Sequence, residues 1–87
     1  MEGRDIEAVK EILKQSIGIK LFLQGESFLK ALVTVEFHEE YMEFAEGERR
    51  ILRVEYAGIG KVSYEKNFRI QILTFTYGKL HVALQIR

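Results

Sequence analysis

The sequence contains no cysteine, no proline and no tryptophan among its 87 residues. Without cysteine the chain can form neither a disulfide nor a thiolate metal site, so a zinc site would need histidine and carboxylate ligands alone. A chain without disulfides fits a reducing compartment, and we therefore expect a cytoplasmic location. The lack of proline is typical of strands that use most of their backbone N–H groups.

The sequence also lacks a long hydrophobic run and a net charge. No apolar run approaches the roughly 18 residues of a membrane span, and the N-terminus carries acid where a signal peptide carries base. We therefore expect neither a membrane span nor export. The 13 Lys and Arg residues balance 13 Asp and Glu residues, which argues against a general nucleic-acid binder.

The apolar content of the chain is high enough for a folded core. Hydrophobic residues make up 47% of the sequence, which excludes a disordered tail. A length of 87 residues suits a single domain, 1–87. The many Glu, Lys and Arg residues, beside one Asp and one Asn, resemble the surface composition of thermophile proteins.

The segment 28–37 has the clearest pattern in the chain, since all its odd positions are apolar. Val33 and its odd-numbered neighbours therefore share one face of a strand, and Thr34 and Glu36 share the other. Ten residues at about 3.3 Å each span about 33 Å, which is long for a strand and suits the bent central strand of a small barrel. Leu32 is apolar on the outer face, where it would cover the helix or meet a partner.

The N-terminal segment has the periodicity of an amphipathic helix. Ile6, Val9 and Leu13 fall on one stripe, Asp5 is placed to cap the first turn, and Gly18 is placed to end the helix. Three turns are too short to persist alone in water, so the stripe must pack against a sheet. We expect this helix to plug one end of a barrel.

After the helix the apolar period changes from 3.6 to 2. We expect a helix at 5–16 and strands at about 19–24, 28–38, 41–46, 50–57, 60–65, 68–76 and 79–86. The short connections between them force antiparallel neighbours. The predicted fold class is mainly β (α+β), with an N-terminal helix followed by six or seven antiparallel strands that form a small barrel or strongly bent sheet.

Three local features predict irregular backbone. Gly58-Ile59-Gly60 indicates a sharp bend, a bulge or one helical turn that joins Ile59 to Val62. The inward pattern of Phe68, Ile70 and Ile72 shifts by one residue at Leu73, which predicts a bulge there. Tyr77-Gly78 is predicted to be the two-residue turn of the last hairpin.

The charged residues are unevenly distributed along the chain. Six acids and no base lie between Glu36 and Glu48, whereas eight bases and two acids follow from Arg49 onward. Two readings are open: charges alternating on the outer faces of strands, or a basic face that contacts phosphate or carboxylate groups. The binding candidates are Arg49, Arg50, Arg53, Lys61, Lys66 and Arg69.

The sequence offers little for catalysis. His38 and His81 lie on different predicted strands and have no sequence relation to a candidate serine nucleophile. Adjacent residues of His38-Glu39-Glu40 point to opposite faces if they are extended, which disfavours a metal site. Gly60-Lys61-Val62-Ser63 lacks the upstream glycine of a phosphate-binding loop. We therefore expect no enzyme activity, no metal and no cofactor.

Residues 53–70 follow the pattern hydrophobic, x, Tyr, x, x, Ile, x, x, Val and then a hairpin. This pattern resembles microbial pleckstrin-homology-like and GRAM-like domains, and Gly25-Glu26 is similar to the entry of their central strand. The resemblance covers most of 24–86 and implies a small barrel that binds lipid head groups or protein segments. Such domains close one barrel end with a C-terminal helix, which here would be replaced by the N-terminal helix.

Two alternatives remain beside a non-catalytic binding module of this kind. Residues 17–20 and 38–44 are similar to the first motif of Sm-like barrels, which implies an oligomer that binds RNA. A third reading is a structural assembly subunit in which the acidic hairpin of one copy meets the basic half of the next. We favour a protein or an anionic ligand as the partner over RNA, and a homo-oligomer remains open.

Overall fold

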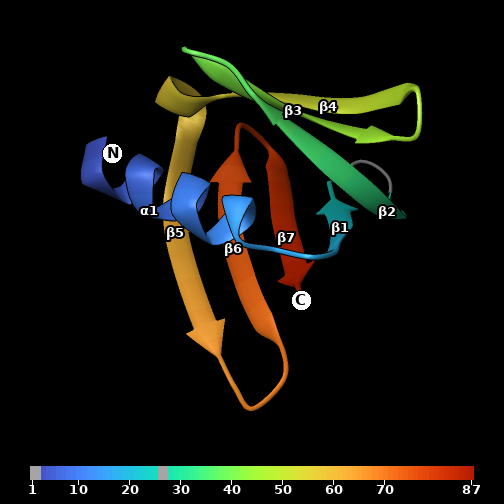
Figure 1. Ribbon diagram of the computed structural model, residues 1–87. Coiled ribbons are helices and arrows are strands. Elements are labelled where there is room, and N and C mark those ends of the chain that lie inside the picture. The colour runs from blue at the N-terminus through green and yellow to red at the C-terminus, as the bar shows by residue number, and fades with distance from the viewer. Residues whose placement is uncertain (1–2, 26–27) are drawn as a thin grey trace.

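Alternating apolar and polar residues form the strands of an antiparallel sheet in the computed structural model, which describes residues 3–25 and 28–87 (Figure 1). The expected fold class is confirmed, and each strand lies within three residues of its predicted bounds. The elements are α1 (Gly3–Lys14), β1 (Ile19–Gln24), β2 (Phe28–Phe37), β3 (Tyr41–Glu46), β4 (Arg49–Glu55), the 3₁₀ turn η1 (Tyr56–Gly58), β5 (Ile59–Lys66), β6 (Gln71–Tyr77) and β7 (Leu80–Ile86).

The strand order is β4-β3-β2-β1-β7-β6-β5. The long strand β2 joins the two halves of this sheet, because its residues 28–33 pair with β1 and its residues 34–37 pair with β3. Figure 1 shows that β2, β3 and β4 run across the direction of β5, β6 and β7, so that the sheet is strongly curled. The predicted bent central strand is therefore present.

The sheet is open between β4 and β5, its two edge strands. η1 links these edges, and the backbone N–H of Glu55 donates a hydrogen bond of 3.2 Å to the Tyr77 hydroxyl of β6. The Tyr77 ring packs so closely on Gly58 that a Cβ there would lie 2.7 Å from the ring. Gly58 therefore allows the chain to cross from one edge to the other.

The hydrophobic core lies on the inner face of the curled sheet. Met42, Phe44 and Val54 from one half and Leu73 and Leu84 from the other are fully buried. α1 lies across the inner side of the sheet in Figure 1 and adds Val9 and Leu13, each 2% exposed. The predicted inward stripe of the helix is confirmed, because its apolar side chains belong to the core that the inner face of the sheet surrounds.

The ends of α1 differ from the prediction. The helix begins at Gly3, so Asp5 lies within it and is not the residue before its first turn. The helix ends at Lys14, four residues before Gly18. At this end the Ser16 hydroxyl donates a hydrogen bond of 2.6 Å to the Leu13 carbonyl. The Leu13 carbonyl also accepts a hydrogen bond of 3.3 Å from the Ser16 backbone N–H, so Ser16 closes the last turn and no glycine is needed at that point. The predicted turn at 24–27 falls partly outside the described residues.

The predicted bulge at Ile72 and Leu73 is wrong. β6 pairs with β7 without interruption, Leu73 and Phe75 point inward, and Ile72 lies on the outer face. Phe68 precedes the strand and is 95% exposed. The register shift occurs instead in β5, between Gly60 and Ser63, where Lys61 has a φ of 50°. A left-handed residue of this kind is typical of a bulge.

Two further local predictions are displaced by a few residues. A bulge was one of the expectations for Gly58-Ile59-Gly60, and the register shift of β5 does begin at Gly60. The helical turn there is η1, which precedes Ile59 and does not join Ile59 to Val62. The last hairpin turns through Gly78 and Lys79, because Tyr77 still pairs with Leu80. Gly78 has a φ of 60°, the conformation that the first central residue of a tight hairpin requires.

The register of β2 can be tested by two neighbouring substitutions. Val33 is 8% exposed and Thr34 is exposed, as the odd-inward pattern predicted. Val33→Ala should lower the free energy of unfolding by about 1 to 3 kcal/mol through lost burial and a residual cavity. Thr34→Ala should stay within about 0.5 kcal/mol, since it removes only an exposed hydrogen bond of 3.4 Å. Urea unfolding measures both, and a larger loss at Thr34 would contradict the register.

Candidate functional site

The six basic residues proposed from the sequence lie at three places on the fold. Arg49, Arg50 and Arg53 belong to edge strand β4, Lys61 belongs to the opposite edge strand β5, and Lys66 and Arg69 lie at the tip of the β5–β6 hairpin. β4 and β5 diverge from η1 in Figure 1, so Arg49 and Lys66 lie at distant ends of the two strands. The fold therefore does not gather the six into one continuous basic face, and binding by any one of them stays a prediction.

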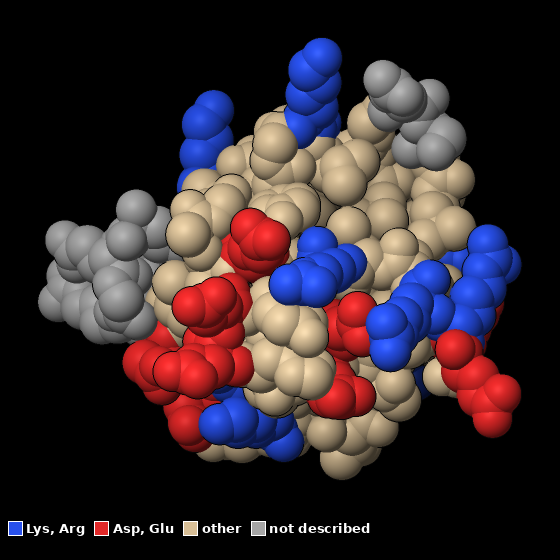
Figure 2. Space-filling view, turned by 90° about the horizontal axis from the view of Figure 1, so that it is seen from above, with Lys and Arg blue, Asp and Glu red and all other residues tan. Residues whose placement is uncertain are grey.

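Two of these arginines interact with neighbouring side chains. The Arg50 Nε lies 3.4 Å from the Glu43 carboxylate, and the Arg53 guanidinium lies 3.8 Å from the centre of the Tyr41 ring. Figure 2 looks onto the side of the molecule that carries β3 and β4, and it shows red and blue side chains intermixed in its lower part. Around β4 the charge pattern therefore corresponds to the first of the two readings, in which acids and bases alternate on the solvent side of the strands.

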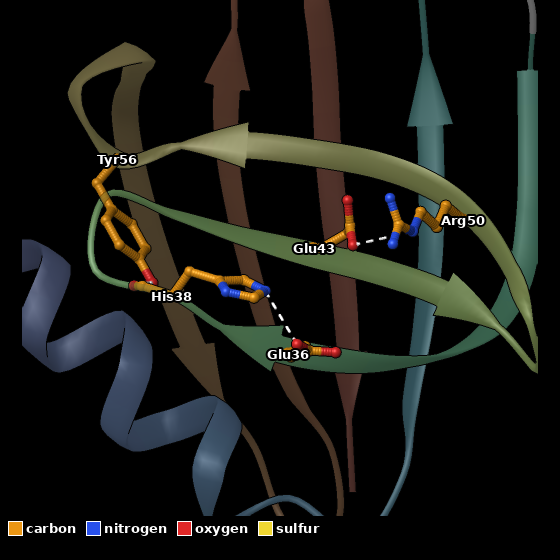
Figure 3. A network of polar contacts seen from close by, with 5 residues as sticks. All are labelled: Glu36, His38, Glu43, Arg50 and Tyr56. Carbon is orange, nitrogen blue, oxygen red and sulfur yellow. Dashed lines mark hydrogen bonds and ion pairs between the residues drawn. The ribbon is translucent and has the colours of Figure 1, made fainter.

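His38 belongs to a polar cluster at the end of β2 (Figure 3). Its Nε2 lies 3.1 Å from Glu36 Oε1, and its ring stacks on Tyr41 with 4.3 Å between centres. The Tyr56 hydroxyl donates a hydrogen bond of 2.9 Å to the His38 carbonyl. Burial raises the pKa of Tyr56 above its usual value, so this hydroxyl keeps its proton at neutral pH. The cluster holds η1 against the β2–β3 connection.

The polar cluster does not resemble a catalytic centre. Among the residues the structure describes, no group of three His, Asp or Glu side chains could hold a metal ion. His38 lies in the β2–β3 connection and His81 lies on β7, so the two histidines belong to different parts of the fold. The Glu36 carboxylate beside His38 is well exposed to solvent, where an ion pair contributes little.

A different surface stands out on the outside of β2, β1, β7 and β6. We call it the outer face, and it consists of the twelve residues that alternate with buried ones where these four strands pair with one another. Leu32, Lys20, Gln85 and Ile72 form one cross-strand row, Lys30, Phe22, Ala83 and Thr74 form the next, and Phe28, Gln24, His81 and Thr76 form the third.

The outer face exposes large apolar side chains. Leu32 is 68% exposed and Phe28 is 67% exposed, although both lie within a regular strand. The Lys30 Nζ lies 5.8 Å from the centre of the Phe22 ring, so its aliphatic stem extends along this apolar surface. Single exposed apolar residues are common, but several on one sheet face indicate an interaction site.

Two hollows lie at opposite ends of the outer face. One, of about 470 Å³, is lined by Ile17, Lys20, Leu32 and Arg87 among others. The other, of about 320 Å³, is lined by Phe22, Phe28, Lys61 and His81 among others. The two hollows are open to solvent, and each combines apolar side chains with a base.

The charge of the outer face has one sign. Its three rows contain Lys20 and Lys30 but no Asp or Glu, and Lys61 and Arg87 add positive charge at the two hollows. The nearest acid across the strands is Glu65 of β5, which pairs with Ile72 at the edge of the first row. This contrasts with the side around β4, where Glu43 and Arg50 pair. The outer face can thus offer apolar contacts together with cations for an acidic partner.

The sequence predicted only part of this surface. Leu32 was recognised as an apolar exception on an outer strand face, and the structure shows that it faces solvent and not the helix. Lys61 was among the predicted binding residues and does line a hollow. Phe22 and Phe28 were not identified, although their outward positions follow from the alternation in β1 and β2. Lys20 and Lys30 precede the basic half of the sequence and were therefore missed.

Comparison of the chain with protein-family models, with curated proteins and with solved structures gave no match in any of the three. No helix in the described part of the chain is long and apolar enough to cross a membrane.

Proposed function

We propose that this chain is a non-catalytic binding module that holds a macromolecular partner on its outer face. The observation that carries the proposal is the exposure of Phe28 and Leu32, each by about two thirds, on a face with cations and no acid. Water contact with these side chains is unfavourable, and a partner that covers them would gain the free energy of their burial. The outer face replaces the scattered basic residues as the proposed binding surface.

The pleckstrin-homology-like resemblance supports the same class of function, because domains of that kind bind protein segments or lipid head groups. The proposal thus includes membership of a pleckstrin-homology-like family, a macromolecular partner and a cytoplasmic location. β6 and β7 pair with β1 within one sheet, so the last hairpin is integral to the fold and not an appendage to a five-stranded Sm-like barrel. We therefore favour a module that binds a protein segment.

The proposal can be tested with an array of peptides of varied charge and hydrophobicity. The outer-face variant is Phe28→Ser/Leu32→Ser, and the control is Phe68→Ser, which removes an exposed aromatic ring away from this face. Peptides captured by the wild-type protein should also be captured by the control, and the outer-face variant should lose them by about tenfold or more. Equal capture by all three proteins would contradict the proposed surface.

A further inference from the structure

Resting on this proposed function, we propose that the partner segment is an amphipathic helix with apolar side chains two turns apart and acidic residues on both sides of the apolar stripe. Helices of this type bind grooves through anchors at regular spacings, here in the two hollows of the outer face. The spacing of the hollows and the sign of the surrounding charge both support this occupant.

The spacing between the hollows fits a helix. Leu32 lines one hollow and Phe28 lines the other, and four residues of extended strand β2 separate them by about 13 Å. Side chains seven or eight residues apart in a helix are separated by about 10.5 to 12 Å along its axis and lie on one face. A helix lying along β1 could therefore place one apolar side chain beside Leu32 and another beside Phe28.

The charges of the outer face fit acidic flanks on such a helix. Lys20 of β1 lines one hollow, and Lys30 of β2 pairs with Phe22, which lines the other. On β2, β1, β7 and β6 the rows that contain these lysines carry no carboxylate. Arg87 and Lys61 stand at the far ends, one at each hollow. Glutamate residues beside the apolar stripe would meet these cations, whereas a basic helix would bring like charge to Lys20 and Lys30.

Other occupants fit this face less well. A second copy offers no free helical stripe, because Val9 and Leu13 of α1, the one α-helix in the described chain, are buried in its own core. A lipid surface binds amphipathic helices through an exposed apolar stripe, but the stripe of α1 is buried and Leu32 and Phe28 lie in a strand. Single-stranded nucleic acid binds by stacking successive bases on rings. Phe22, Phe28 and His81 offer rings at one hollow, but the row of Leu32 and Ile72 at the other end has none.

The experiment uses a fluorescent helical peptide of about five turns, with leucine at positions i and i+7 and glutamate on both flanks. Its binding is measured by fluorescence anisotropy, with a scrambled peptide of the same composition and a peptide with lysine flanks as controls. We expect the acidic helix to bind and the scrambled peptide to bind at least about tenfold more weakly, because only the helix aligns both anchors.

Paired charge reversals test the position of the contact. Lys20→Glu/Lys30→Glu should weaken the acidic peptide by about tenfold and should strengthen the lysine-flanked peptide. The matched control is Lys66→Glu/Arg69→Glu, which reverses two exposed charges at the β5–β6 tip and should leave both affinities unchanged. Weakening by the control reversal alone would overturn the proposal and return the site to the predicted basic residues of that hairpin.

The remaining outcomes separate the two proposals. If array peptides depend on Phe28 and Leu32 but the acidic helix does not bind, the helical partner is wrong and the binding module stands. If neither depends on the outer face, both proposals fail. Binding of phosphatidylserine vesicles or of a single-stranded oligonucleotide that is lost in Lys20→Glu/Lys30→Glu, without binding of the peptide, would overturn the helix in favour of that ligand. If the protein self-associates and Phe28→Ser/Leu32→Ser abolishes the self-association, the helical partner is overturned in favour of a second copy of the chain.

Discussion

Phe75→Ala should lower the free energy of unfolding by about 3 to 5 kcal/mol, one of the largest losses expected of a single substitution in this protein. The Phe75 side chain is 2% exposed on the inner face of β6, so its removal deletes buried apolar area and leaves a cavity in the core. A domain of this size has a total stability of about 4 to 13 kcal/mol. The substitution should therefore lower the melting temperature by about 12 °C or more, measurable by circular dichroism.

The matched control for this prediction is Phe68→Ala, seven residues earlier in the chain. The Phe68 ring is 95% exposed before β6 begins, so its loss should change the stability by no more than about 0.5 kcal/mol. Similar losses at both positions would mean that the β5–β6 hairpin packs its tip against the core. That result would contradict the arrangement of β6 described above.

Leu13→Asp should destabilise the protein by about 4 kcal/mol or more, because it places a carboxylate where α1 packs on the sheet. Leu13 is 2% exposed, and the core around it offers apolar side chains of β2 such as Val33. The substitution loses the burial of leucine and adds the desolvation of an unpaired charge. We expect weak cooperativity of unfolding and increased binding of a hydrophobic dye as α1 detaches.

Ala8→Asp provides the control on the same helix. Ala8 is exposed, so the change costs only the difference in helix propensity, about 0.7 kcal/mol or less. If Leu13→Asp were tolerated as well as Ala8→Asp, α1 would be dispensable for the core, and the sheet would have to bury its inner face in another way.

The strands were predictable because the apolar alternation that forms them is local. Val33 and its odd-numbered neighbours had to share a face, since side chains alternate along any strand. Met42 and Phe44 stand at alternate positions in the same way, and both are fully buried. The amphipathic stripe of α1 was equally clear, because Val9 and Leu13 lie one turn apart.

The predictions that differ from the structure concern segments in which two local patterns are equally good and only the tertiary structure decides between them. Ile72 and Leu73 are both apolar, and only the pairing of β6 with β7 shows which of them points inward. The outer face was largely missed because it combines residues from four strands whose order in the sheet is not written in the sequence. The charge split at Arg49 suggested a shared surface, but β4 and β5 carry those charges to opposite edges of the sheet.

The pairing of β1 with β7 also determines when the protein can fold during its synthesis. β1 to β4 form a meander of near neighbours, and so do β5 to β7, but the two meanders pair as strands only between β1 and β7, from Ile19 opposite Ile86 to Gln24 opposite His81. Contacts between such distant residues are slow to form, because a long loop must close before they contribute stability. A nascent chain would therefore emerge from the ribosome with α1 and β1 unsupported on one side. We expect the cooperative core to form only after β7 has left the exit tunnel.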